Sequence, residues 1–251
     1  MSLRAGVTTD RPWPIVLHGG DGRARVRPWW NDSSVAIMTF IDHGNVPSST
    51  AIRVWLGELL AHGFTSVRTG AVTDVGADTL QRQGFETLQT LRLLDVSLVG
   101  WRPPVGNTTH SRRLKVLERG EAARVDRAAF GEQWAIDVDG IGETCTATPS
   151  HRARTIHSDD LARPLAGYAI SGRAERTGYL QRLAVHPEQQ GRGVGFSLAC
   201  DSLVWMQRRR LTRAVVNTHT DNDVALGLYR RMGFRVLPQG LAVMSRSLRD
   251  L

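Results

Sequence analysis

A glycine-rich turn between an apolar segment and a helical one is the stretch of this chain whose residue types point most directly to chemistry. The apolar segment 180–185 leads through His186 into Gln190-Gly191-Arg192-Gly193-Val194-Gly195, and a helix is expected over 193–210. Glycines permit positive φ and the close approach of a bulky anion. The first N–H groups of a helix lack intrahelical partners, and with the helix dipole they attract negative charge. Arg192 adds a fixed positive charge, so the order strand, glycine loop, helix predicts a pyrophosphate site.

Two familiar phosphate loops do not fit this stretch. No Gly-Lys-Ser or Gly-Lys-Thr follows, which excludes a Walker loop. The position three after Gly195 is Leu198, so the dinucleotide fingerprint with its third glycine is absent too. A tight turn without any ligand would use the same glycines, and residues elsewhere in the chain must decide between the two interpretations.

Three downstream residues could take part in the same site. Asn222 precedes a helix expected over 223–232, where an N-cap role alone would explain it. Tyr229 lies beside the apolar positions of that helix and could be an amphipathic residue at the edge of the core. His219 ends the preceding strand, and its ordinary pKa near 6.5 would allow it to accept a proton.

Taken in order, these motifs resemble those of the GNAT N-acetyltransferases over roughly residues 112–247. Gln190-x-x-Gly193-x-Gly195 after Leu183-Ala184-Val185-His186-Pro187 is similar to the family's acetyl-coenzyme A motif. Asn222 and Leu228-Tyr229-x-x-x-Gly233-Phe234 are similar to its downstream pattern. The resemblance implies an α+β fold with a mixed, mostly antiparallel sheet flanked by helices, in which two strands splay apart around acetyl-CoA.

The resemblance also implies roles for individual residues. The pantetheine would pair with the strand edge at Leu183–Val185, and the pyrophosphate would lie on the backbone amides of Gly191–Phe196. The implied cofactor-binding set is Leu183, Ala184, Val185, Gln190, Gly191, Arg192, Gly193, Val194, Gly195, Phe196 and Asn222. Tyr229 would be the general acid in a direct attack by an amine on the thioester, with acetyl-CoA as co-substrate and no metal.

The general base is not implied by the resemblance. Asn217 and Tyr179 stand where ribosomal-protein and histone-type members carry their bases, and neither side chain can take a proton at neutral pH. His219, a water chain or an amine that arrives neutral could each replace the base. Without a base, a non-catalytic acyl-CoA sensor or scaffold is the alternative function, and the acceptor amine is unknown.

An internal repeat divides the chain. The pattern V-x-T-x4-D-V-x6-R-x-G-F-x2-L occurs at Val67–Leu88 and again at Val216–Leu237. In each copy a strand, a helix, Gly-Phe and another strand are expected. With a proline-rich linker near residues 101–109, the repeat predicts a degenerate partial copy over 1–96 and an acetyltransferase domain over 97–251.

The first copy lacks the residues that would do chemistry. The stretch 41–46 corresponds to the glycine loop but has neither Gly-x-Gly nor an arginine. Thr73 stands at the position of Asn222, and Leu80 at the position of Tyr229. We therefore expect no phosphate binding and no acid catalysis in that half, whose role would be structural.

Acidic residues gather in the helical region 121–143, which in the family lines the acceptor side. They are Asp126, Glu132, Asp137 and Glu143. Two interpretations stay open: these carboxylates attract a cationic amine, or they form a solvated helix face.

The composition sets the remaining limits. Apolar residues make up 41% and charged residues 22% of the 251, as in ordinary globular proteins, and no apolar run approaches the ~20 residues of a membrane span. Only two cysteines occur, so neither a disulfide framework nor a cysteine-based metal cluster is expected, and the cytoplasm is the expected location. Lys115 is the only lysine beside 31 arginines, which indicates GC-rich codons and a bacterial source. The net charge of +8 would suit an anionic partner, but we expect neither nucleic acid nor a membrane as partner.

Overall fold

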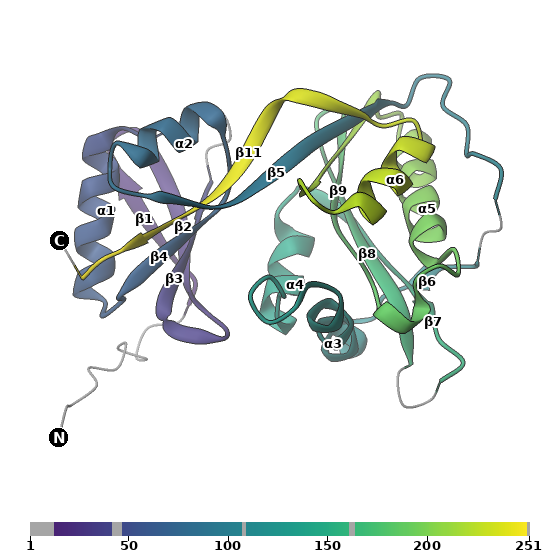
Figure 1. Cartoon of the computed structure of the whole chain (residues 1–251), viewed down its shortest axis with the longest axis horizontal. Coiled ribbons are helices and arrows are strands. Elements are labelled where there is room, and N and C mark those ends of the chain that lie inside the picture. Colours follow the sequence, from purple (N-terminus) through teal and green to yellow (C-terminus); the bar gives the residue numbers. More distant parts are fainter. Residues whose placement is uncertain (1–12, 42–46, 107–108, 161–163, 250–251) are drawn as a thin grey trace. The chain divides into compact units, whose positions relative to one another are not determined.

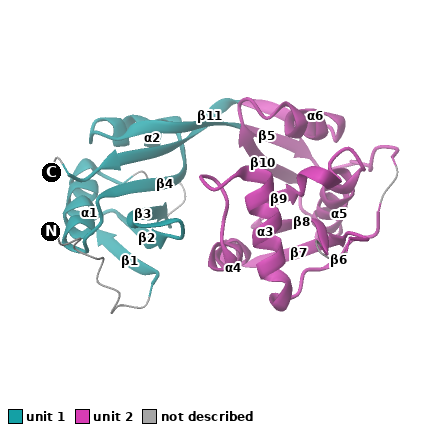
Figure 2. Ribbon diagram, turned by 60° about the horizontal axis from the view of Figure 1, so that its bottom comes forward, with its two compact units in different colours: residues 1–92, 238–251 teal, residues 93–237 magenta. Residues whose placement is uncertain are grey.

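The computed structural model describes residues 13–41, 47–106, 109–160 and 164–249 (Figure 1). The chain divides into two compact units, and each is described by itself. Unit 1 comprises residues 1–92 and 238–251, and unit 2 comprises residues 93–237 (Figure 2).

Unit 2 combines a six-stranded sheet with four α-helices among its described residues. In chain order its elements are β6 (Arg112–Arg113), η1 (Val116–Glu118), α3 (Arg119–Phe130), α4 (Val138–Thr146), β7 (Ser150–His157), β8 (Leu165–Ala174), β9 (Thr177–Val185), η2 (Pro187–Gln189), α5 (Val194–Arg208), β10 (Arg213–His219) and α6 (Asp223–Arg231). Together with β5 (Glu86–Ser97), the strand order is β5-β10-β9-β8-β7-β6. Strands β6 to β9 pair antiparallel, and β10 joins β9 in parallel. This is the mixed, mostly antiparallel α+β sheet that the sequence predicts.

Helices cover both faces of this sheet because β8 is apolar on both sides. Ala169 packs in the core formed with α5, whereas its neighbours Tyr168 and Ile170 pack with α3 and α4. Successive side chains of a strand point to opposite faces, so a fully apolar strand requires cover on each. The sheet is thereby held between α5 on one face and the pair α3 and α4 on the other.

Unit 1 repeats the later part of that order in smaller form. Its elements are β1 (Ile15–Gly19), β2 (Gly22–Trp29), β3 (Asp32–Phe40), α1 (Ser49–Ala61), β4 (Ser66–Thr73) and α2 (Asp74–Gln81). Three antiparallel strands, a helix, a parallel strand and a helix thus follow one another, as in β7 to α6. Ile52, Trp55, Leu56 and Leu59 of α1 are fully buried in its core. Residues 42–46, which correspond to most of the glycine loop, lie outside the described residues.

Two long strands pass from one unit into the other. Strand β5 (Glu86–Ser97) begins in unit 1, and its residues from Leu93 lie beside β10. Strand β11 (Arg235–Ser247) begins in unit 2, and Leu241–Ser247 pair with β4 in unit 1 (Figure 2). The predicted domains end and begin at 96/97, whereas the compact units place residues 93–96 in unit 2 and residues 238–251 in unit 1.

Candidate active site

The glycine loop connects β9 to α5 through two left-handed residues. Gly191 has φ +73° and Gly193 has φ +81°, a region that residues with a Cβ rarely adopt. Gly193 is the N-cap of α5 and has no side chain with which to cap it. The N–H groups of Val194, Gly195 and Phe196 therefore start the helix without a side-chain acceptor, which is the arrangement that an anion requires.

Two neighbouring side chains hold the loop in shape. The Gln190 side-chain amide donates to the Val185 carbonyl at 3.3 Å, so it ties the loop back to the last residue of β9. The His186 Nδ1 accepts the Glu188 N–H at 3.3 Å at the start of η2 (Pro187–Gln189). His186 thus has the turn role that its position before a proline suggests.

Strands β9 and β10 separate just before this loop. Their paired residues are Arg213 with Thr177, Ala214 with Gly178 and Val215 with Tyr179. Beyond that point β9 runs on to Val185 and β10 to His219 without further pairing between them. On its other side β9 stays paired with β8 up to Val185. Leu183, Ala184 and Val185 consequently present one strand edge that no described strand pairs with.

The start of α5, the end of β9 and the helix α6 meet at Gly195. A Cβ built there would lie 3.5 Å from Val185, 3.6 Å from Leu228 and 3.8 Å from Leu183. Leu228 precedes Tyr229, whose side chain is 5% exposed and whose ring centre lies 5.5 Å from that of Phe234. Burial raises the pKa of the Tyr229 phenol above its ordinary value of 10.0, so the hydroxyl keeps its proton at neutral pH.

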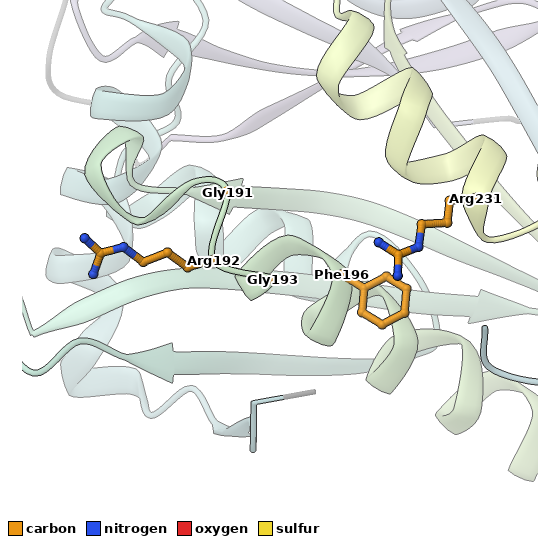
Figure 3. A pocket seen from close by; sticks show the side chains of 5 residues that line it. All are labelled: Gly191, Arg192, Gly193, Phe196 and Arg231. Atoms are coloured by element: carbon orange, nitrogen blue, oxygen red, sulfur yellow. The ribbon is translucent and has the colours of Figure 1, made fainter. Parts of the chain in front are cut away.

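A pocket of about 360 Å³ opens at this loop. It is lined by Gly191, Arg192, Gly193, Phe196 and Arg231 (Figure 3). Four of these belong to the predicted phosphate site. Arg231 was not predicted, although the repeat pattern contains it, because its direction depends on how α6 packs.

A family model decides what this combination of loop, open strand edge and buried tyrosine is. The model of the Acetyltransferase (GNAT) family matches residues 132–234, from just before α4 to the Gly-Phe after α6. Residues 132–234 are a GNAT domain. The resemblance on which the sequence analysis rests is thereby confirmed for this part of the chain.

Individual relatives agree with the GNAT domain at low identity. A protein named mycothiol acetyltransferase from Arthrobacter sp. (strain FB24) is 32% identical over 118 residues, which are 47% of this chain and 34% of the relative. One of the same name from Renibacterium salmoninarum is 26% identical over 199 residues, 69% of this chain and 56% of the relative. The chain thus spans between a third and somewhat over half of the length of these curated relatives.

Solved structures extend the likeness beyond the GNAT domain. A tandem GNAT protein from the clavulanic acid biosynthesis pathway superimposes with a TM-score of 0.62 and covers 92% of this chain and 81% of its own. At 14% sequence identity this agreement shows the fold, and it confirms the predicted α+β GNAT architecture.

The other two candidate residues have structural roles in the GNAT domain. The Asn222 Oδ1 accepts the Ala225 N–H at 3.1 Å, which caps α6. The His219 Nδ1 accepts the Asp221 N–H at 3.1 Å. The Asp221 carboxylate lies near the same ring nitrogen, with its Oδ2 3.8 Å from Nδ1.

Asp126, Asp137 and Glu132 each have a partner within the structure. Asp126 is fully buried, receives two hydrogen bonds from Arg182 at 2.5 and 2.8 Å, and accepts the Tyr168 hydroxyl at 2.6 Å. Burial and the neighbouring Asp126 raise the pKa of Tyr168. Asp137 caps α4 by accepting the Gly140 N–H, and Glu132 pairs with Arg127 at 3.4 Å. Asp126 is therefore not part of a solvated helix face, because it is buried as the counter-ion of Arg182, whose side chain is 21% exposed.

Among the described residues, no three His, Cys, Asp or Glu side chains lie together as a metal would require. Within the same residues, no helix has the length and apolar character to cross a membrane.

Proposed function

We propose that unit 2 binds acetyl-CoA and transfers its acetyl group to an amine. The observation that supports this proposal is the open edge of β9, which the glycine loop connects to the uncapped first turn of α5. An extended ligand with amide groups can form backbone hydrogen bonds with such a strand edge. An anion at the end of that ligand can accept hydrogen bonds from the free N–H groups at the start of the helix. Acetyl-CoA has both parts, a pantetheine arm and a pyrophosphate.

The residues present fit that ligand in a defined order. The strand edge at Leu183–Val185 would hydrogen-bond the pantetheine amides through backbone groups. The loop from Gln190 to Phe196 would take the pyrophosphate, and Asn222 would contact the arm from the start of α6. The thioester would then lie near Tyr229. The preceding residue, Leu228, and the last residue of β9, Val185, both lie next to Gly195.

The reaction requires few groups of the protein. A neutral amine attacks the thioester carbonyl carbon and forms a C–N bond, and the tetrahedral intermediate then collapses with cleavage of the C–S bond. Tyr229 gives its proton to the departing thiolate and regains one from solvent. Once the C–N bond has formed, the nitrogen of the amine carries an extra proton, which would pass to water or to His219.

The identity of the amine is open to a direct test. Because relatives are named mycothiol acetyltransferase, the mycothiol precursor that lacks the acetyl group heads the acceptor panel, followed by peptides and other amines. Release of coenzyme A in the presence of any of them supports an enzyme. Binding of acetyl-CoA with no release of coenzyme A across the panel would favour the alternative, a non-catalytic sensor.

We also propose a cytoplasmic location. The two cysteines are free and buried, which fits that location.

The decisive binding experiment is calorimetry on the Gly193→Asp variant. The substitution places a carboxylate where the pyrophosphate is expected and gives a Cβ to a residue at φ +81°. Affinity for acetyl-CoA should fall at least tenfold, about 1.4 kcal/mol. Gly193→Ala separates backbone strain from charge and should lose less. The wild type should bind one equivalent; unchanged binding by Gly193→Asp, or a second equivalent in the wild type, would contradict this site.

A further inference from the structure

The pocket beside the glycine loop has a cationic wall that the GNAT motif does not include. Arg231, from the last turn of α6, lines this pocket together with Gly191, Gly193 and Phe196 (Figure 3). Among the described residues no carboxylate forms an ion pair with Arg231. A permanently charged guanidinium beside an uncapped helix start is therefore without a counter-ion in this part of the chain.

Two contacts fix the direction of Arg231. Its guanidinium carbon lies 4.6 Å from the centre of the Phe196 ring, and its Nη2 donates to the Val105 carbonyl at 3.0 Å. The chain at Gly106 closes over this pair, since a Cβ there would lie 2.8 Å from the Phe196 ring and 3.0 Å from Nη2. A guanidinium has five N–H donors, and the Val105 carbonyl uses one. The side chain is thus held in place with donors left for a ligand.

Helix geometry alone does not account for this arrangement. A cation in the last turn complements the helix dipole wherever it points. Arg82, at the equivalent position of the first repeat, donates to the Thr79 hydroxyl of its own helix at 3.2 Å. Arg231 instead reaches away from α6 to the Phe196 ring of α5.

Arg192, the cation expected from the motif, points elsewhere. Its Nη1 donates to the Gln189 side-chain oxygen at 3.4 Å, and like Arg231 the residue is exposed. Figure 3 shows its side chain extended away from Phe196 and Arg231. The guanidinium of Arg231 is therefore held beside Phe196 in the pocket, whereas that of Arg192 extends away from it.

We propose that Arg231 binds a phosphate group of the coenzyme's nucleotide end, and that Arg231 supplies more of the binding than Arg192 does. The inference rests on the proposed function, because it assigns a ligand to the same pocket. The planar fork of arginine matches two phosphate oxygens, and the Phe196 ring orients that fork before the ligand arrives. Both the pyrophosphate and the 3′-phosphate of coenzyme A have the required chemistry.

Calorimetry with coenzyme A on four variants of the full chain tests the assignment. Arg231→Gln should bind at least tenfold more weakly than the wild type, and Arg192→Gln at most threefold more weakly. Arg231→Lys, which keeps the charge without the fork, should fall between Arg231→Gln and the wild type. Arg82→Gln is the matched control from the first repeat and should bind as the wild type does.

Salt and a second ligand separate binding from folding. If Arg231 pairs with phosphate, the ratio of affinities between wild type and Arg231→Gln shrinks when KCl rises from 50 to 500 mM. With dephospho-coenzyme A, a ratio that persists assigns Arg231 to the pyrophosphate, and a ratio near one assigns it to the 3′-phosphate. The proposal is overturned if Arg231→Gln binds coenzyme A within twofold of the wild type, or if its loss is the same at both salt concentrations. If the wild type itself fails to bind coenzyme A, the proposed function is wrong.

Discussion

The two copies of the repeat, residues 67–88 and 216–237, build the same strand–helix–strand unit with nearly the same backbone devices. Thr73 caps α2 by accepting the Gly76 N–H, and Asn222 caps α6 by accepting the Ala225 N–H. Each helix ends before a glycine with positive φ, +76° at Gly84 and +88° at Gly233. The N–H of the following phenylalanine donates to a carbonyl of the helix, from Phe85 to Leu80 at 3.1 Å and from Phe234 to Tyr229 at 3.0 Å.

The copies differ in one buried side chain of the helix. The helix position that packs into the core is Leu80 in one copy and Tyr229 in the other, and the side chains are 1% and 5% exposed. The fold therefore requires a large buried side chain there, and leucine meets that requirement. The phenolic hydroxyl is an addition that packing does not explain, so substitutions at matched positions can separate stability from catalysis.

The largest expected effect is on stability, from Leu80→Ala. Removing a fully buried leucine side chain typically costs 2–5 kcal/mol, so the free energy of unfolding should fall by about 3 kcal/mol. Urea denaturation measures the loss, and Leu80→Met, which conserves volume, should lose less than about 1.5 kcal/mol. Affinity for acetyl-CoA should stay within twofold of the wild type. A tenfold loss of affinity would mean that the first copy contributes to the site.

The next effect, of similar size but opposite kind, is expected from Tyr229→Phe. The ring and its contact with Phe234 are kept, and only the hydroxyl is lost. If Tyr229 protonates the thiolate, kcat should fall roughly 10²-fold, about 2.7 kcal/mol, while acetyl-CoA affinity changes only a few-fold. The melting temperature should stay close to that of the wild type. Preserved kcat, or activity lost only together with stability, would remove Tyr229 from the mechanism.

The pH dependence of the wild type sharpens the same test. An acid works only while it holds its proton, and burial raises the pKa of Tyr229 above the ordinary 10.0. As the pH increases from 7 to about 9, the phenol stays protonated, so kcat should show no decline from this group. A descending limb within that range that disappears in Tyr229→Phe would show that the hydroxyl ionises earlier than its burial implies.

The features that the sequence predicted well are those with a local cause. Three such features are the glycine loop, the N-cap Asn222 and the glycine at position 233. Each affects residues only a few positions away, so the sequence spacing is enough to predict it. The helix predicted over 223–232 is α6 (Asp223–Arg231) for the same reason.

Features that depend on distant partners were missed or misjudged. Strand β11 is continuous across Pro238 and Gly240, because Leu241–Ser247 pair with β4 and the Gly240 N–H donates to Asp74 at 3.3 Å, which local sequence alone does not indicate. Asp126 lies in a charged helix, but its partner Arg182 is 56 positions away. The direction of Arg231 likewise depends on Phe196 of another helix.

The smallest expected effect compares the two N-caps, Thr73→Ala and Asn222→Ala. Each substitution removes the side-chain acceptor of one first-turn N–H, which costs about 1 kcal/mol. Hydrogen exchange should accordingly increase in the first turn of α2 in one variant and of α6 in the other, to a similar degree. If Asn222 also contacts the pantetheine arm, Asn222→Ala loses acetyl-CoA affinity in calorimetry, whereas Thr73→Ala keeps it. Asn222→Asp provides the control, because it retains the cap but replaces the amide N–H donors with a carboxylate. Affinity that survives both changes at position 222 would leave Asn222 with the capping role alone, as at Thr73.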